Sequence, residues 1–173
     1  EKNAQEFRLQ KDEILLIDSL HGLFEKMTES VPTEAKFKFY IETLCQIRDD
    51  DGEFVRWADW RLLRRMVRDS WHRSYDPLRT VGHWHYVRRS ELRHIIPFIG
   101  SVDYVVNSAM PFEMPIMKSK LFKYFPMAME MYKDDAKRQD AYIRAKRICE
   151  LMSTLTEVAD DSCIPKKSLL REF

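Results

Sequence analysis

The sequence alternates short apolar segments with long stretches of helical periodicity, and this alternation constrains the fold more than any other feature. The run "ILLI" within residues 12–18 predicts a fully buried strand that ends at Asp18. The stretch "KFKFYIET" predicts a second strand, and "DYVVNSA" at 103–109 predicts a third, buried one. Since long helical stretches lie between strands, we expect an α/β fold with a parallel sheet and flanking helices.

Helical periodicity accounts for most of the remaining chain. One helix is expected to begin near Asp59, as its N-cap, and to end before residues 74–77. A second helix is expected over roughly 78–94, with a break near Gly82. The region 113–173 is expected to be mostly helical, with helices over about 113–131, interrupted at Pro126, and about 134–153.

The composition excludes several classes of protein. The chain has 173 residues, of which 45% are apolar, enough for one ordinary domain. No apolar run approaches the ~20 residues that a membrane helix needs, and the polar opening "EKNAQEFRLQ" does not resemble a signal peptide. The three cysteines are widely spaced and form no CxxC pair. We therefore expect a cytoplasmic protein with no membrane partner and no disulfide framework.

Residues 56–94 carry most of the positive charge. This segment contains ten arginines, no lysine and four acidic residues, whereas the whole chain has a net charge of only +1. It includes "RLLRRMVRDSWHRSYD", in which Arg61, Arg65 and Arg68 share one helical face and Arg64 lies beside it. Planar guanidinium groups suit bidentate contacts with phosphate, and arginines above a transferred phosphoryl group would offset its charge. Alternatively, the arginines pair with acids such as Asp69 on an exposed helix.

The stretch "LLIDSLHG" places a carboxylate directly after a predicted buried strand. In a parallel sheet this position is the carboxyl edge, where ligand sites of α/β proteins lie. In phosphoryl-transfer enzymes an acid there holds Mg²⁺, directly or through water. In the alternative interpretation, Asp18 caps a turn that His21 and Gly22 complete.

The segment "HWHYVRRSELRH" offers a weaker signal. His83, His85 and His94 suggest a metal site, but no cysteine joins them and nothing in their spacing defines a ligand geometry. Arg88 and Arg89 instead extend the predicted phosphate-facing surface, or pair with acids.

Aromatic residues are interleaved with these arginines, which also allows a nucleic-acid interface with stacked bases. The residues concerned are Trp57, Trp60, Trp71, Trp84 and Tyr86. We expect Trp60 and Trp71 to be core residues instead, because they lie on the apolar stripe of the first helix.

These stretches, in this order, resemble the uridine kinase and phosphoribulokinase family of P-loop kinases. "ILLIDSLHGL" is similar to the family's strand ending in "EG-hydrophobic-HG", with Asp18 where Glu is usual. "RLLRRMVRDSWHRSYD" resembles the uridine kinase lid helix, "RLxRRxxRDxxxRxxD". "RSYD", Trp84 and "VRRSE" resemble the "RGYS", Trp and "VRRGE" of a uridine kinase-like branch. The match covers about residues 10–118 and is looser beyond them.

The resemblance implies a P-loop kinase-like sheet and a role for several residues. Asp18 would take the place of the acid near Mg²⁺ and the γ-phosphate, and Arg65 and Arg68 match catalytic lid arginines. The implied substrate- or phosphate-binding residues are Arg61, Arg64, Arg73, His21, Arg88 and Arg89. Tyr75 stands where uridine kinases have another lid arginine, and His83 stands where they have a substrate-contacting glutamine. The nature of the acceptor therefore stays open.

The largest departure from the family is a missing motif. The family's GxxxxGK[ST] loop cradles phosphates, but the four glycines of this chain each stand alone. We therefore expect residues 1–173 to be the carboxyl-terminal part of a kinase domain, with 56–94 as its lid, and to be inactive without an upstream P-loop half.

The intact protein would be an ATP- and Mg²⁺-dependent kinase of a small-molecule hydroxyl, a nucleoside above all. Two alternatives remain: a non-catalytic nucleotide- or phosphate-binding regulatory module and, with less support, a nucleic-acid-binding domain. Homo-oligomer formation stays open.

Overall fold

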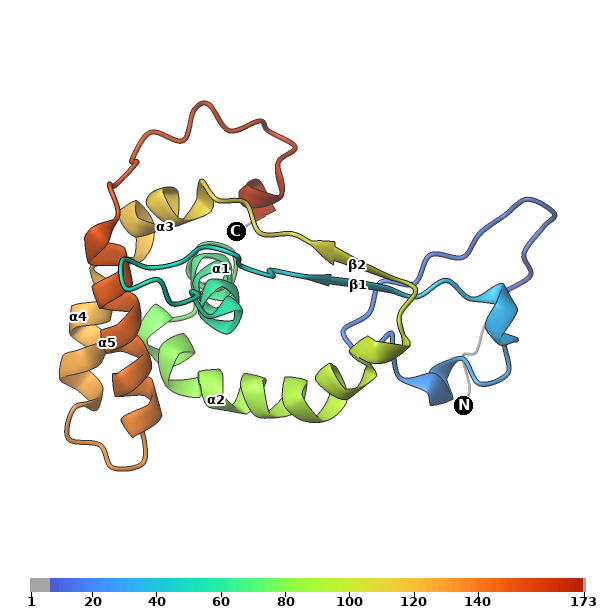
Figure 1. Cartoon of the computed structure of the whole chain (residues 1–173), viewed down its shortest axis with the longest axis horizontal. Coiled ribbons are helices and arrows are strands. Elements are labelled where there is room, and N and C mark those ends of the chain that lie inside the picture. Colours follow the sequence, from blue (N-terminus) through green and yellow to red (C-terminus); the bar gives the residue numbers. More distant parts are fainter. Residues whose placement is uncertain (1–6, 173) are drawn as a thin grey trace.

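A computed structural model describes residues 7–172 as an α/β arrangement. Figure 1 shows a helical body on one side, from which a narrow sheet and the N-terminal segments extend to the other side. Across the described residues there are five α-helices and one two-stranded sheet. The expected α/β class is therefore confirmed at this general level.

The two strands are parallel neighbours although more than sixty residues separate them. β1 is Phe39–Glu42 and β2 is Tyr104–Asn107, with Phe39 opposite Tyr104 and Glu42 opposite Asn107. Alternate side chains of β1 point to opposite faces, so Tyr40 and Glu42 are buried while Phe39 and Ile41 are exposed. The two predicted strands are confirmed, but the expectation that 103–109 is buried is wrong, because β2 is largely exposed.

The strand predicted within residues 12–18 is not formed. The segment does not pair with either strand of the sheet, and Ile14 and Leu16 are 91% and 87% exposed. An isolated extended segment gains neither backbone hydrogen bonds nor apolar burial, and a parallel strand requires a neighbour and cover on both faces. Asp18 consequently does not lie at the carboxyl edge of the sheet, which corrects the sequence-based expectation.

Helix α1, Trp57–His72, is the central helix of the body and confirms the helix expected there. Its apolar stripe is buried, with Leu63 and Met66 fully covered, but Trp71 is 61% exposed and is not a core residue. The predicted N-cap was wrong, since Arg56 holds the cap position. Asp59 lies in the first turn, where its charge complements the helix dipole. Its carboxylate also pairs with Arg147 of a later helix, α5 (Gln139–Thr154), at 2.8 Å.

Helix α2, Pro77–His94, begins at a capped turn, in which the Asp76 carboxylate accepts a hydrogen bond from the Leu78 amide at 2.9 Å. The helix continues through Gly82 without the predicted break. The glycine serves packing instead: a Cβ there would lie 2.4 Å from the hydroxyl of Tyr132, which donates to the carbonyl of Leu78.

The remaining helices are α3 Glu113–Leu121, α4 Tyr124–Tyr132 and α5 Gln139–Thr154. The predicted interruption is present, but it lies at residues 122–123 and not at Pro126. Pro126 occupies the first turn of α4, where a missing N–H removes no helical hydrogen bond. Short 3-10 segments cover Glu25–Met27, Thr33–Ala35, Ile96–Ser101 and Leu169–Glu172.

All five helices contribute to one apolar core, which includes Leu63, Val81, Met117, Phe125 and Ile148. In Figure 1, α1 is seen nearly end-on between α2 and α3, and α4 and α5 close one side. None of the helices in residues 7–172 combines the length and apolar character needed to cross a bilayer.

Candidate anion-binding site

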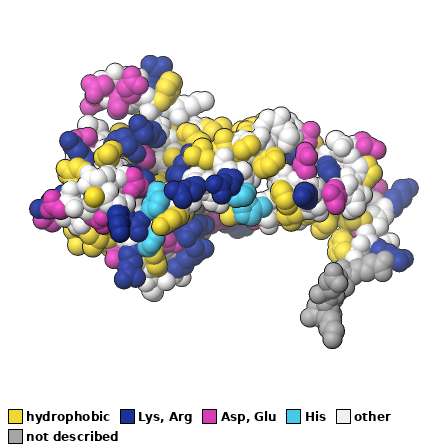
Figure 2. Space-filling model, turned by 90° about the horizontal axis from the view of Figure 1, so that it is seen from below, with side chains coloured by type: hydrophobic (Ala, Val, Ile, Leu, Met, Phe, Trp, Pro, Cys, Tyr) yellow, Lys and Arg dark blue, Asp and Glu magenta, His cyan; other side chains and the backbone are white. Residues whose placement is uncertain are grey.

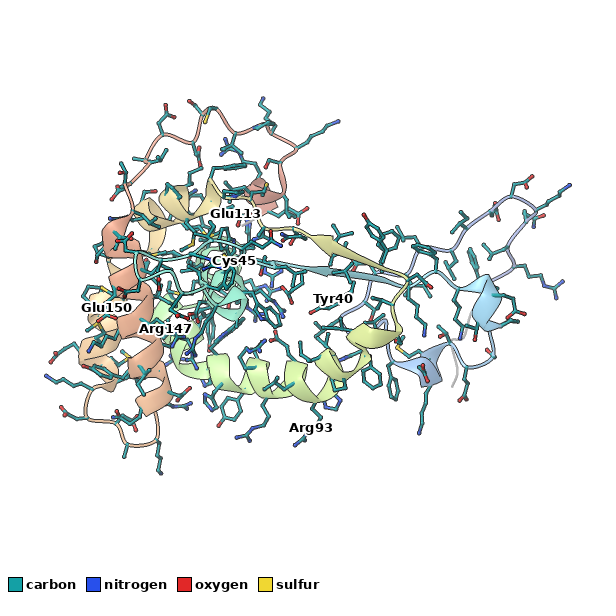
Figure 3. All side chains as sticks on the ribbon, viewed as in Figure 1. Tyr40, Cys45, Arg93, Glu113, Arg147 and Glu150 are labelled. Atoms are coloured by element: carbon teal, nitrogen blue, oxygen red, sulfur yellow. The ribbon has the colours of Figure 1, made fainter. Side chains whose placement is uncertain are left out.

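The arginines of α1 fall into two groups that the sequence could not separate. Those of the first group pair with buried acids of other elements. Arg64 is 7% exposed and pairs with the fully buried Glu113 of α3, with its Nε 2.8 Å from Oε2. Its guanidinium also donates to the side chain and carbonyl of Ser108. Figure 3 shows Glu113 beside α1. Because these contacts occupy the Arg64 donors, we leave Arg64 out of the candidate site.

Arg61 and Arg88 are also engaged with acids. Arg61 pairs with Glu42 at the end of β1, at 3.2 Å, and with Glu91 of α2. Arg88 pairs with the same Glu91 and lies over the ring of Trp57, with 4.8 Å between the guanidinium carbon and the ring centroid. This network ties α1 and α2 to the sheet, in line with the alternative in which arginines pair with acids.

The second group shares a single carboxylate. Arg65 Nε lies 2.7 Å from Asp69 Oδ2, and Arg73 lies 3.4 Å from Oδ1 of the same side chain. Thr80 of α2 donates its hydroxyl to Asp69 at 3.2 Å, which fixes the carboxylate between the two helices. Two guanidinium groups are thus held by one negative charge.

Arg68 pairs with no acid among residues 7–172. Its Nε is buried and makes no hydrogen bond, and its guanidinium forms no ion pair with residues 7–172. Burial and the positive charges of Arg65 and Arg73 lower the pKa of Arg68. A buried donor without an acceptor costs free energy, so this arginine is the strongest sign of an anion site.

Arg65 and Arg73 line a groove between α1 and α2, together with Tyr75, His83 and Trp84. The groove encloses about 260 Å³, below the ~300–1,000 Å³ typical of whole drug-sized ligands. Its size therefore suits a phosphate group or another part of a ligand. Figure 2 shows Lys, Arg and His side chains gathered on the face that α2 presents.

Trp84 supplies a second donor that lacks an acceptor. Its side chain lines the groove, the residue is 3% exposed, and its Nε1 makes no hydrogen bond within the described part of the chain. The burial of Trp60 confirms its expected place in the core, and the burial of Trp84 removes one of the aromatic surfaces on which bases would stack in a nucleic-acid interface.

The other predicted site residues lie elsewhere. Asp18 is exposed, and His21, three residues later, contacts His94 at the C-terminal end of α2, with ring centroids 6.0 Å apart. The groove lies nearer the opposite end of that helix, around Thr80 and His83. Arg89 is exposed on α2 outside the groove. The structure thus does not bring Asp18 and His21 to the arginines of α1.

The acids that pair with Arg61, Arg64 and Arg88 could not be identified from the sequence. Glu42, Glu91 and Glu113 come from β1, α2 and α3, and each is nearly or fully buried beside an arginine. Their only signal in the sequence is a single acid within an otherwise apolar or basic segment. Their partners depend on how distant elements pack.

Comparison of the chain with protein-family models, with curated proteins and with solved structures gave no match. Whether the residues present fit ATP and Mg²⁺, the cofactors that the resemblance implies, therefore has to be judged from the groove itself. Among its lining residues, Trp84 has a donor without an acceptor in the described residues, and Arg68, beside Arg65 and Arg73 but outside the lining, has another. Such donors fit the phosphate groups of ATP. Within residues 7–172 no group of three or more His, Cys, Asp or Glu side chains is arranged to hold a metal ion, so we derive no step through Mg²⁺.

Proposed function

We propose that this chain is part of an ATP-dependent kinase that phosphorylates a hydroxyl of a small molecule of the nucleoside class. In this proposal α1 and α2 form the arginine lid of a P-loop kinase-like domain, and an upstream half of the intact protein supplies the glycine-rich loop. The observation that carries the proposal is the grouping of Arg65, Arg68 and Arg73 beside Asp69, whose carboxylate pairs with Arg65 and Arg73 but not with Arg68.

The chemistry assigned to this group is electrostatic. Phosphoryl transfer spreads charge over the equatorial oxygens, and prearranged guanidinium groups stabilise that charge. Arg65 and Arg73 are held in place by Asp69, whereas the buried Nε of Arg68 has no acceptor in the described residues and is assigned to the ligand. ATP, when bound, supplies the phosphoryl group. The lid residues bind its oxygens and exclude water from them.

Calorimetric titration with inorganic tripolyphosphate tests the anion site directly. We expect the chain to bind this probe and Arg68→Gln to weaken binding at least tenfold, because a charge-assisted contact is lost. Arg93→Gln is the matched control, since Arg93 is an exposed arginine on the outer side of α2 (Figure 3). Equal affinity of the Arg68 and Arg93 variants would contradict the proposal.

We also expect the chain by itself not to transfer phosphate, because none of its 173 residues belongs to a GxxxxGK[ST] loop. A kinase assay with ATP and a nucleoside panel measures this. Turnover that disappears in Asp18→Ala would overturn that expectation.

One observation favours a second candidate, a non-catalytic phosphate-binding module. Asp18 is exposed in an extended segment and does not approach the groove. Such a module predicts tripolyphosphate binding by the intact protein without phosphate transfer. A kinase predicts both, so one binding assay and one turnover assay on the intact protein separate the two.

A further inference from the structure

His83 occupies a defined place at the groove between α1 and α2. It lies on α2 and lines the groove with Arg65 and Arg73. Its Nδ1 is 3.1 Å from the carbonyl oxygen of Arg79, one helical turn earlier, and 3.3 Å from the hydroxyl oxygen of Tyr75. Both partners therefore lie at one ring nitrogen.

These contacts assign the proton of the neutral ring. A carbonyl oxygen can only accept a hydrogen bond, so the shorter contact requires a proton on Nδ1 of His83. The Tyr75 oxygen then also lies on the accepting side, which leaves the O–H of Tyr75 able to donate elsewhere. In this tautomer Nε2 of neutral His83 carries a lone pair and repels an anion, so Nε2 donates only after it takes up a second proton.

We propose that protonated His83, oriented by Arg79 and Tyr75, is a further cationic ligand of the phosphate groove, and that binding of a dianion takes up one proton there. This inference rests on the proposed function and concerns the same groove. With His83 protonated, the groove should bind a doubly charged phosphate group more tightly than a singly charged one, since a dianion gains more from an additional cation.

The charges around His83 support this assignment. From α1 the groove receives Arg65, Asp69 and Arg73, and the single carboxylate is already shared by the two arginines. From α2 the ring of Tyr86 lies 6.1 Å from that of His83 between centroids. An unliganded groove therefore carries a net positive charge, whereas a bound dianion reverses the sign of the local field.

Isothermal titration with sodium sulfate at pH 5.5 and pH 7.5 tests the inference, because sulfate stays a dianion throughout this range. We expect about tenfold tighter binding at the lower pH, the change produced when binding requires one histidine proton. His83→Gln should make the affinity independent of pH. His94→Gln is the matched control, since His94 contacts His21 and lies outside the groove, and it should keep the full pH dependence.

Tyr75→Phe provides a second measurement, because it removes a hydrogen-bond donor and leaves the His83 imidazole in place. We expect about fivefold weaker sulfate binding at both pH values with the pH dependence retained, as for the loss of one hydrogen bond. Equal thermal unfolding midpoints would show that the variants are folded.

The outcomes distinguish this inference from the proposed function. If neither sulfate nor tripolyphosphate binds at either pH, the phosphate groove itself is wrong. If sulfate binds equally at both pH values and Arg68→Gln abolishes that binding, the groove stands and the role of His83 is overturned. Retention of the pH dependence in His83→Gln would overturn the role of His83 in the same way.

Discussion

The helical body and the sheet region both have patterned apolar residues, but these residues are buried in the body and largely exposed in the sheet region. In the body, the apolar positions of α1, α3 and α5 meet one another and are covered. In the sheet region and the segment before it, apolar residues such as Ile14, Phe39 and Ile41 remain exposed, although their pattern predicts burial equally well. Figure 1 shows the reason, since the helices surround α1 whereas the strands extend beyond the body.

This contrast shows that an apolar pattern indicates which side chains of a segment need to be buried. Whether they are buried depends on the elements that pack against the segment. A helix satisfies its backbone within itself and needs a partner on one face. A parallel strand needs a hydrogen-bonded neighbour and cover on both faces. Stability should consequently be concentrated in the helical body, and the following substitutions test this.

The largest effect is expected at Glu113, whose carboxylate is fully buried between Arg64 and the Nε1 of Trp60. Glu113→Ala leaves a buried guanidinium without its acid, so the free energy of unfolding should fall by about 3–5 kcal/mol. Urea titration followed by circular dichroism measures this. Glu150→Ala, at an exposed ion pair on α5, is the control and should cost less than about 0.5 kcal/mol.

A pair of apolar truncations compares the two regions directly. Leu63→Ala in α1 should lower the free energy of unfolding by about 2–5 kcal/mol, because it leaves a cavity in the core. Ile41→Ala in β1 should cost less than about 0.5 kcal/mol, because that side chain is 62% exposed. Similar losses for both variants, measured by chemical unfolding, would break the comparison.

Gly82 tests the contact between α2 and α4. Alanine has a higher helix propensity, but its Cβ would overlap the Tyr132 hydroxyl and disturb the hydrogen bond to Leu78. We expect a net loss of about 1–2 kcal/mol in the free energy of unfolding. Gly100→Ala is the control, as open space surrounds that position. A stabilised Gly82→Ala variant would argue against close packing of these helices.

The smallest effect concerns Tyr40, on the covered side of β1. Burial and the nearby charge of Glu42, which accepts its hydroxyl at 3.0 Å, raise the pKa of Tyr40. A raised pKa in the folded state gives stability that is complete below the pKa of the unfolded tyrosine, about 10, and is lost as the pH rises further. Tyr40→Phe should therefore show a shallower loss of unfolding free energy above pH 10.

Unfolding curves between pH 8 and pH 11 measure this slope. Tyr104→Phe is the matched control, because Tyr104 is an exposed tyrosine on the neighbouring strand. If the two variants lose stability equally steeply, Tyr40 is not held in its protonated form by the fold.

Much of the secondary structure could be predicted from local sequence. The helices over 57–72 and 77–94 follow from their periodicity and the intervening proline, and the two paired strands follow from their β-branched and aromatic residues. Where a prediction from local sequence was wrong, the packing of distant segments determined the structure instead. Gly82 looked like a helix break but receives Tyr132, and Trp71 continued an apolar stripe but lies outside the core.

The candidate site was predictable only as a region. The sequence by itself determined that residues 56–94 hold ten arginines and no lysine, and that a helix presents several of them on one face. The tertiary structure alone decided that Arg61 and Arg64 pair with buried acids, and that the Nε of Arg68 has no acceptor among residues 7–172. The physical reason is that helical spacing is a local property, whereas the partner of a charge depends on which distant segment packs against it.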